Sequence, residues 1–562
     1  MWTIGRRLLT SLLVIWILAA AGYGAQRLTL YSWNAVVEYR SPFASPLPFG
    51  VGGAPLARRV VLVVVDGLRL DSSRTMKTLN ALREQGADFR AWTGEPSLSY
   101  PGWTLIASGA AQEVSGVTTN WYRGPVRVDH LFAAAKRAGF RTGLAGHAGW
   151  GKLFPGALDE RVLINDPPYA EIDPLYRTSD SVAAGALGLL GQDLQLILVH
   201  FPSVDLLGHG FGGASPQYAE SVRRVDRHLA TLLAAVDLGS TTVIVTSDHG
   251  HIDRGGHGGW EPVVKQVPLV LAGAGIRRGV QGGDVRQVEV APTVAVLLGI
   301  PIPAHSQGRP LVEALEADGR VFGPRWADQQ RSLYSYIAGY LGRPALAGLF
   351  SDARLTTLTD GPDGVATFSD QIALEYYQAR SARLEKERAR RLPIASILAA
   401  LPLLYIIVHD RRRLLFPAAL AAAAFFAIDY GLFYGRGYAF SLSVFNTESN
   451  ILRFFNQRLI DAAIAISAAG LVAGFFTARG GIGDAARTGL DTGFLVAYAL
   501  VLQVLYFYWL WDIRFTWYLP DLRLGFKYYL DLLKLVPVGY LAVGYMLLAV
   551  AARGIRRTLF SR

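Results

Sequence analysis

Acidic and histidine side chains follow three short apolar runs of this chain that have the character of buried strands. The runs are residues 60–65, 194–201 and 241–246, and the side chains that follow them are Asp66, then Asp205 with His209, then Asp248 with His249. Ligands of open α/β sheets bind beyond the carboxyl ends of the strands. Three such ends could therefore bring these groups together in one crevice.

The spacing of these groups favours metal binding. Asp205 and His209 are four residues apart and can face one ion from a helix or a tight loop, while His257 follows in a glycine-rich stretch, GGHGG. Mixed carboxylate and imidazole ligands suit zinc or manganese better than calcium or magnesium. The chain has no cysteine, which excludes cysteine-based zinc fingers, iron–sulfur clusters and a cysteine nucleophile. Six side chains of this kind predict two divalent metal ions sharing a site, Zn²⁺ first and Mn²⁺ as the alternative.

Four other histidines are expected to be structural or exposed. They are His200, His228, His251 and His305.

A serine just before an apolar helical run is the candidate nucleophile. In the segment PSLSYPG, Pro101 suits the first turn of a helix, which places Ser99 at the helix N-terminus. Backbone N–H groups and the helix dipole favour anions there, so a serine alkoxide beside metal ions is a competent nucleophile. The alternative is an ordinary capping serine.

The elements that must position these residues indicate an α/β fold over residues 58–315. Nearly continuous apolar strands, separated by helical patterns such as residues 215–238, predict a mostly parallel sheet covered on both faces. The strand candidates are residues 60–65, 142–145, 194–201, 241–246 and 268–271.

The composition changes from residue 392 onward. Apolar runs near residues 392–408, 414–434, 459–476, 494–513 and 535–552 are each close to the roughly 20 residues that cross a bilayer, and residues 8–21 form another. With Arg6 and Arg7 inside, the alternation of six spans also puts further basic residues inside, as the positive-inside rule requires. These are Arg411, Arg412, Arg413, Arg479, Arg487, Arg553, Arg556, Arg557 and Arg562. We therefore expect a multi-pass protein of the cell membrane with its catalytic domain on the non-cytoplasmic side.

Five segments follow from these patterns. They are an N-terminal anchor at 1–24 (a cleaved signal peptide being the alternative), an irregular linker at 25–57, the metal-dependent catalytic domain at 58–315, a helical extension with a membrane-leading helix at 316–391, and a membrane domain of about five helices at 392–562.

Composition excludes two other classes. A chain that is 51% hydrophobic and 18% charged is not disordered. The net charge of +11 does not indicate nucleic acid, because much of the basic excess flanks apolar spans and no basic stripe with interleaved aromatic residues occurs in the polar half.

At these residues the sequence resembles the alkaline phosphatase superfamily, in its type I phosphodiesterase/nucleotide pyrophosphatase branch. The segments that carry the resemblance are VVLVVVDGLR, PSLSYPGWTLIASG, VDLLGH, VTSDHGH, GGHGG and APTVAVLLGIP, in that order. A closer likeness is to the GPI ethanolamine phosphate transferases, which share the DGLR opening and the Pro-Gly pair after the nucleophile. This chain departs from them in having fewer C-terminal spans, and in Trp103, where a histidine is common.

The resemblance implies a role for each matching residue. Ser99 takes the place of the nucleophile and bridges to one metal, whose other ligands are Asp66, Asp248 and His249. The second metal takes Asp205, His209 and His257, and Asn120 holds a phosphoryl oxygen.

The predicted function is phosphotransfer through a phospho-serine, moving a phosphoethanolamine-like group from a membrane lipid donor to a glycolipid or glycan acceptor. Two alternatives stay open: a phosphodiesterase or pyrophosphatase that uses water, and a channel or transport protein with a degenerate enzyme domain. Asp429 and Asp461 in the apolar spans would support the last. The sequence leaves the oligomeric state undetermined.

Overall fold

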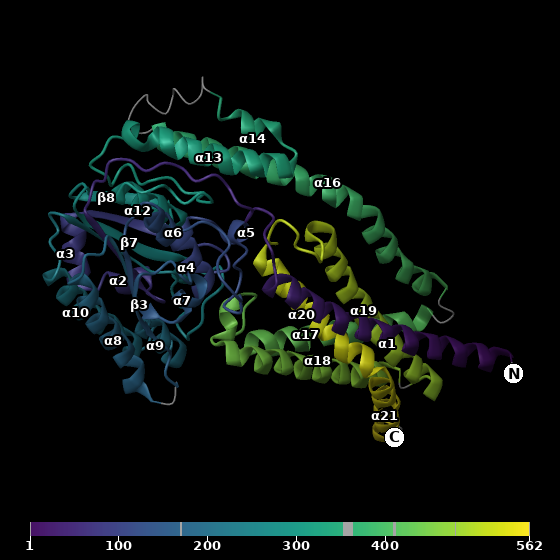
Figure 1. Ribbon diagram of the computed structural model, residues 1–562. Coiled ribbons are helices and arrows are strands. Elements are labelled where there is room, and N and C mark those ends of the chain that lie inside the picture. The colour runs from purple at the N-terminus through teal and green to yellow at the C-terminus, as the bar shows by residue number, and fades with distance from the viewer. Residues whose placement is uncertain (1, 169–170, 352–363, 409–411, 478, 561–562) are drawn as a thin grey trace. The chain divides into compact units, whose positions relative to one another are not determined.

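The computed structural model describes residues 2–168, 171–351, 364–408, 412–477 and 479–560 (Figure 1). Two of the basic residues expected inside, Arg411 and Arg562, lie outside the described residues. The chain divides into two compact units. One comprises Met1–Val36, Leu384–Phe515 and Pro520–Arg562, and the other comprises Val37–Arg383 and Thr516–Leu519.

The second of these, the catalytic unit, is built on an eight-stranded sheet of order β4-β3-β5-β1-β6-β7-β2-β8. The strands are β1 (Arg59–Val65), β2 (Ala87–Trp92), β3 (Thr142–His147), β4 (Glu160–Ile164), β5 (Leu196–Phe201), β6 (Thr241–Thr246), β7 (Gln266–Gly273) and β8 (Val280–Arg286). All neighbouring pairs are parallel except those that β7 makes with β6 and β2. The predicted mostly parallel α/β fold is confirmed.

Helices connect the strands of this unit and follow the last of them. They are α2 (Leu70–Ser73), α3 (Lys77–Gln85), α4 (Ser99–Ser108), α5 (Gln112–Ser115), α6 (Leu131–Arg137), α7 (Gly149–Leu153), α8 (Ile172–Leu190), α9 (Ser203–Phe211), α10 (Pro216–Ala234), α11 (Pro262–Lys265), α12 (Val290–Leu298), α13 (Gly319–Leu341) and α14 (Pro344–Gly348).

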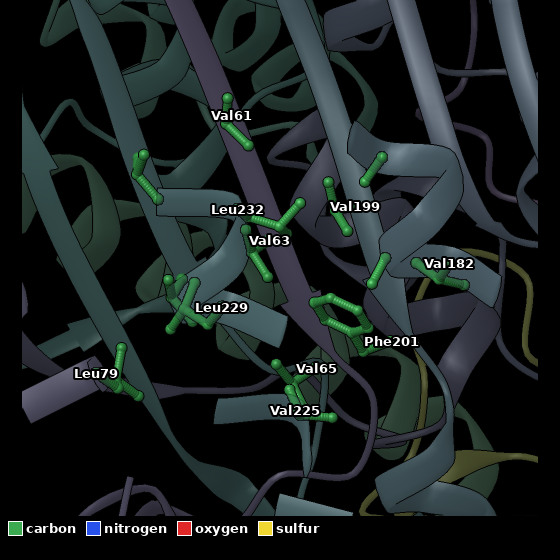
Figure 2. Packing of buried hydrophobic residues seen from close by; sticks show 14 of the residues in the cluster. Val61, Val63, Val65, Leu79, Val182, Val199, Phe201, Val225, Leu229 and Leu232 are labelled. Carbon is green, nitrogen blue, oxygen red and sulfur yellow. The ribbon is translucent and has the colours of Figure 1, made fainter. Parts of the chain in front are cut away.

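Strand β1 lies at the centre of the sheet and is buried on both faces. Its alternate side chains Val61, Val63 and Val65 pack against helices α3, α8 and α10 in one apolar cluster (Figure 2). Side chains alternate across a strand, so the intervening residues face the opposite layer, where α12 contacts β1. A strand with two buried faces needs a continuous apolar sequence, and the segment RVVLVVV has one.

The sequence analysis did not predict strands β2, β4 and β8, and each omission has a physical reason. Strand β4 alternates partly buried and exposed residues at one edge of the sheet, so it lacks a continuous apolar run. Strand β8 forms the other edge and contains two glycines, while β2 carries Asp88 and Arg90 among its apolar residues. The prediction also missed that β7 runs antiparallel, which its composition does not reveal.

The other unit consists of long helices. They are α1 (Trp2–Val37), the end of α16 (Gly364–Val408), α17 (Leu415–Gly435), α18 (Glu448–Phe476), α19 (Ile482–Trp511), α20 (Leu522–Tyr540) and α21 (Ala542–Phe560). Among the described residues, five helices are long and apolar enough to cross a membrane, and α20 with α21, bent by 64°, would make a sixth. The six predicted apolar segments therefore correspond to helices, the last being a bent pair rather than one straight span.

Two details of the predicted segments need correction. Residues 25–37 continue helix α1 instead of forming an irregular linker. Helix α16 runs unbroken from the predicted membrane-leading helix into the next apolar run, with Pro393 and Pro402 inside it. The domain boundaries themselves stay predictions.

A buried network of charges joins three helices of this unit. Arg458 pairs with Asp429 and, at 2.8 Å, with Asp461, while Lys534 lies 3.0 Å from Asp429 and 3.3 Å from Asp531. None of the five is more than 2% exposed. Charges in an apolar surrounding need opposite partners, so the network couples α17, α18 and α20.

Removing the cation at the centre of this network should destabilise the protein. We expect Arg458→Met to cost about 3 kcal/mol or more, because it leaves Asp429 and Asp461 short of a partner. The matched control is Arg436→Met, since Arg436 is 41% exposed and pairs with Asp461 at 3.1 Å, and it should cost below about 1 kcal/mol. Thermal unfolding of the detergent-purified chain measures both, and equal melting temperatures for the two variants would contradict the expectation.

Candidate two-metal active site

The three acids singled out in the sequence lie at the carboxyl ends of three adjacent strands. Asp66 follows β1 directly, Asp205 lies in α9 after β5, and Asp248 follows β6 by two residues. Strand β1 pairs with β5 on one side and β6 on the other. The topology thus places the three carboxylates side by side at one edge of the sheet.

These acids and four histidines form two clusters. One contains Asp66, Asp248 and His249, and the other contains Asp205, His209, His251 and His257. Within each cluster, one ligand atom per residue lies within 4.8 Å of the others. All six predicted ligands are brought together, in the two sets that the family resemblance implies.

His251, which was expected to be structural or exposed, lies in the second cluster although sequence reasoning did not single it out for the site. Its side chain is fully buried, and Nε2 lies 2.7 Å from Asp205 Oδ1. Its Nδ1 accepts a hydrogen bond from the Gly256 backbone, so a neutral ring donates from Nε2 and orients the Asp205 carboxylate. The sequence held one usable signal, namely glycines at positions 67 and 208, where a Cβ would lie 2.9 and 2.7 Å from the His251 ring.

The electrostatics of the first cluster fit a divalent cation. Burial raises the pKa of Asp66 well above its ordinary range, and the charges of Asp248 and Asp205 raise it further. Burial likewise raises the pKa of Asp248, against the opposing effect of His249. Asp66 Oδ1 is buried and makes no hydrogen bond among the described residues, although His249 Nε2 lies 3.4 Å away. A cation bound there would offset both the repulsion and the lost hydration.

The second cluster is also suited to a cation. Burial acts to raise the pKa of Asp205, but the charges and hydrogen bonds of His209 and His251 hold it well below its usual value. Burial lowers the pKa of His257 well below its ordinary value, so the ring is neutral and can offer a nitrogen lone pair. A carboxylate with imidazole nitrogens is a donor set that suits zinc or manganese.

Two aromatic side chains contact the carboxylates of the first cluster through their ring N–H groups. Trp103 Nε1 donates to Asp248 Oδ2 at 2.9 Å, and His200 Nε2 lies 2.9 Å from Asp66 Oδ2. Trp103 is buried and stacks on Trp150 with ring centroids 5.1 Å apart. The tryptophan that replaces the family's common histidine thus supplies an N–H donor to a predicted metal ligand.

Ser99 begins helix α4 and lies beside the first cluster. Its Oγ is 3.4 Å from His249 Nε2. The N-cap residue of α4 is Leu98, so Ser99 is not the capping serine that the alternative required. Gly102 allows this helix to approach closely, because a Cβ there would lie 3.0 Å from Asp248 Cβ.

Asn120 lies next to the start of the same helix. Its Oδ1 accepts a hydrogen bond from the Tyr100 backbone N–H at 2.9 Å. Because the carboxamide oxygen already accepts this hydrogen bond, the side chain can offer its N–H groups as donors to a ligand.

Comparison with known proteins supports the resemblance. Residues 60–257 match the family model described as type I phosphodiesterase/nucleotide pyrophosphatase. The catalytic part of this chain resembles that family.

Curated relatives extend the match. GPI ethanolamine phosphate transferase 1 of Mus musculus is 26% identical over 328 residues, covering 50% of this chain and 34% of the relative. The catalytic subunit of GPI ethanolamine phosphate transferase 2 of Homo sapiens is 28% identical over 288 residues, covering 47% and 28%. The chain thus spans about a third of the length of the curated relatives it matches.

Solved structures give a fainter likeness. Alkaline phosphatase PafA matches with a TM-score of 0.39 and 12% identity, over 47% of this chain and all of that one. Murine ectonucleotide pyrophosphatase/phosphodiesterase 5 matches with a TM-score of 0.37 and 13% identity, over 44% and 96%.

Disabling the second cluster should remove one metal ion. We expect Asp205→Asn combined with His209→Ala to lower metal content from about two ions per chain to about one, because half of that ligand set is lost. The matched control is Asp180→Asn with His228→Ala, an Asp–His pair 2.8 Å apart outside both clusters. Elemental analysis of the purified chains measures this, and equal metal content in the two double variants would refute the second site.

Removing the Trp103 hydrogen bond should weaken the first site selectively. We expect Trp103→Phe to reduce metal affinity about tenfold or more, since loss of a donor that orients a ligand typically costs that much. Trp150→Phe is the control, because Trp150 stacks on the same ring but its Nε1 makes no hydrogen bond among the described residues. Titration of the metal-free chains with Zn²⁺ measures both, and a larger effect of the control would contradict the assignment.

Proposed function

We propose that this chain is a membrane-bound phosphotransferase that moves a phosphoethanolamine group from a lipid donor to a hydroxyl of a glycolipid or glycan. The observation that carries the proposal is the placement of the Ser99 hydroxyl at a helix N-terminus, beside two clusters of metal-ligating groups. The similarity to GPI ethanolamine phosphate transferases supports the substrate class. The helices long enough to cross a membrane support a lipid donor.

Two divalent cations, Zn²⁺ first and Mn²⁺ as the alternative, complete the proposed site. Asp66, Asp248 and His249, with Ser99, would hold one, and Asp205, His209 and His257 would hold the other. Such ions stabilise negative charge on the entering and leaving oxygens of phosphoryl transfer.

Ser99 is the proposed nucleophile of a double displacement. Its Oγ attacks phosphorus, the bond from phosphorus to the donor alcohol breaks, and Ser99 carries the phosphoethanolamine group as a phosphodiester. The serine proton is released, and the leaving alcohol, diacylglycerol where the donor is phosphatidylethanolamine, takes up one proton. The acceptor hydroxyl then attacks phosphorus, losing its proton while Ser99 regains one.

The chain's own groups can stabilise the phosphoryl oxygens during both steps. Ser99 lies in the first turn of α4, where the positive end of the helix dipole favours an anion. The Asn120 amide adds N–H donors beside the same helix turn. Donors fixed before the reaction act more strongly than water, because they need no reorganisation.

A second candidate function is hydrolysis, with water as the acceptor in the second step. The matching family model favours it, since its description names phosphodiesterases and nucleotide pyrophosphatases. The residue roles are the same in both cases, so the products distinguish the two.

Replacement of the nucleophile should abolish both phosphotransfer and hydrolysis while the metal ions stay bound. We expect Ser99→Ala to lower turnover of labelled phosphatidylethanolamine by at least about 10³-fold, as loss of a covalent nucleophile does, while metal content stays near two ions per chain. The control is Ser108→Ala at the other end of helix α4, where Oγ makes local hydrogen bonds, donating to Thr104 O at 2.6 Å and accepting from the Ala110 N–H at 3.1 Å.

Mass spectrometry of the reaction products distinguishes transfer from hydrolysis. Labelled phosphoethanolamine on a glycolipid supports transfer, and free phosphoethanolamine alone supports hydrolysis instead. Wild-type activity in Ser99→Ala would refute Ser99 as the nucleophile.

A further inference from the structure

A second Asp–His pair lies at the same edge of the sheet as the proposed metal site. Strand β3 ends at His147, which is paired in register with Ile164, and Asp166 follows Ile164 by two residues. Strand β3 lies between β4 and β5, and Asp205 follows β5. His147 and Asp166 therefore flank the cluster that contains Asp205.

The Asp166 carboxylate is only weakly engaged by its histidine neighbour. His147 Nδ1 accepts a hydrogen bond from the Gly149 backbone, so in a neutral ring the proton is on Nε2. That atom lies 3.6 Å from Asp166 Oδ2, beyond ordinary hydrogen-bond length. This contact therefore leaves the carboxylate able to accept a hydrogen bond from a ligand.

Asp166 is accessible, whereas the predicted metal ligands are not. Its side chain is 44% exposed, compared with 12% for Asp205 and 5% for Asp66. Its charge nevertheless acts on Asp205, His209 and Asp66. Asp166 thus lies on the rim of the site, open to solvent and within electrostatic range of both clusters.

Aromatic rings connect the helix turn of the nucleophile to the histidine beside this carboxylate. Tyr100 follows Ser99, and the Trp103 ring centroid lies 5.3 Å from Tyr100 and 5.6 Å from His147. All three rings converge on Gly149, where a Cβ would lie 2.7 to 2.9 Å from an atom of each. Ring contacts therefore extend from Tyr100, the residue after Ser99, to His147, the neighbour of Asp166.

An accessible carboxylate beside aromatic rings is suited to bind an organic cation. Carboxylates bind ammonium groups by charge-assisted hydrogen bonds, and ring faces attract cations. The two metal-ligand clusters found among the described residues do not include Asp166, so its charge is not assigned to either ion. In phosphoethanolamine, a two-carbon arm separates the phosphate from an ammonium group.

We propose that Asp166 determines substrate specificity by binding the ammonium group of the transferred phosphoethanolamine, with the Tyr100 ring alongside. This inference rests on the proposed function, because it presumes that the head group occupies the space between Ser99 and the rim. It adds a determinant that the six proposed metal ligands and Ser99 do not supply, since those groups would hold the ions or attack phosphorus.

The test compares two substrates in the full-length chain. We expect Asp166→Asn to lower the ratio of kcat/KM for phosphatidylethanolamine to that for bis(4-nitrophenyl) phosphate by about 10- to 100-fold, the usual worth of a hydrogen bond to a charged group. Asp166→Glu should restore part of this preference. The control is Asp180→Asn, which removes a comparably exposed acid (46%) outside the site and should keep the wild-type ratio.

A ratio that stays within about twofold of wild type in Asp166→Asn would overturn the proposal, whether both rates fall together or neither changes. A common fall would show that Asp166 supports the metal site, and no change would show that it has no role. Metal content is measured in each variant, and loss of a metal ion in Asp166→Asn would likewise overturn the proposal.

A competition assay separates this inference from the proposed function. With bis(4-nitrophenyl) phosphate as substrate, phosphoethanolamine should inhibit the wild-type chain about tenfold better than ethyl phosphate, and Asp166→Asn should remove that difference. This assay needs no transferase activity. Equal inhibition of the wild type by the two compounds would overturn ammonium binding, whereas absent turnover of phosphatidylethanolamine with preserved discrimination would contradict only the lipid donor.

Discussion

The catalytic unit depends on burying three carboxylates, Asp66, Asp205 and Asp248, beside one another. Each loses hydration, and their charges repel, which raises the pKa values of Asp66 and Asp248. Such a cluster persists only on a rigid support, and adjacent strands β5, β1 and β6 provide it, with every residue of β5 and β6 buried. The hydrophobic core therefore sets the positions of the acids, and their shared need for positive charge determines what the site can bind.

A neutral ring with an N–H group contacts each of these carboxylates. Trp103 donates to Asp248, His200 contacts Asp66 and His251 contacts Asp205. Burial lowers the pKa of both histidines, and for His251 to about 4, so these rings stay neutral. A neutral donor fixes the direction of a carboxylate without cancelling its charge, which stays available to a cation.

The sequence analysis predicted those residues of the candidate site whose positions follow from strand ends and motif spacing. Five of the predicted ligands, Asp66, Asp205, His209, Asp248 and His249, follow strand ends, so their proximity follows from a parallel sheet. His257 was predicted from its glycine-rich stretch and Ser99 from its place at the start of a helix. His251 and Asp166 could not be assigned in that way, because their roles depend on close approach through Gly67, Gly208 and Gly149 and on the edge strand β4. Strands β4 and β8 themselves were missed since an edge position removes the need for a continuous apolar run.

The unit of long helices shows how this chain neutralises buried acids that need no ligand. Asp429, Asp461 and Asp531 are as buried as the acids of the catalytic unit, and each pairs with arginine or lysine. Among the described residues, the ion-pair partners of Asp66, Asp205 and Asp248 are histidines alone. Arginine and lysine carry a permanent charge that would compete with a metal ion, whereas neutral histidine serves as its ligand. The contrast within one chain thus supports the proposal that cations would neutralise the acids of the catalytic unit.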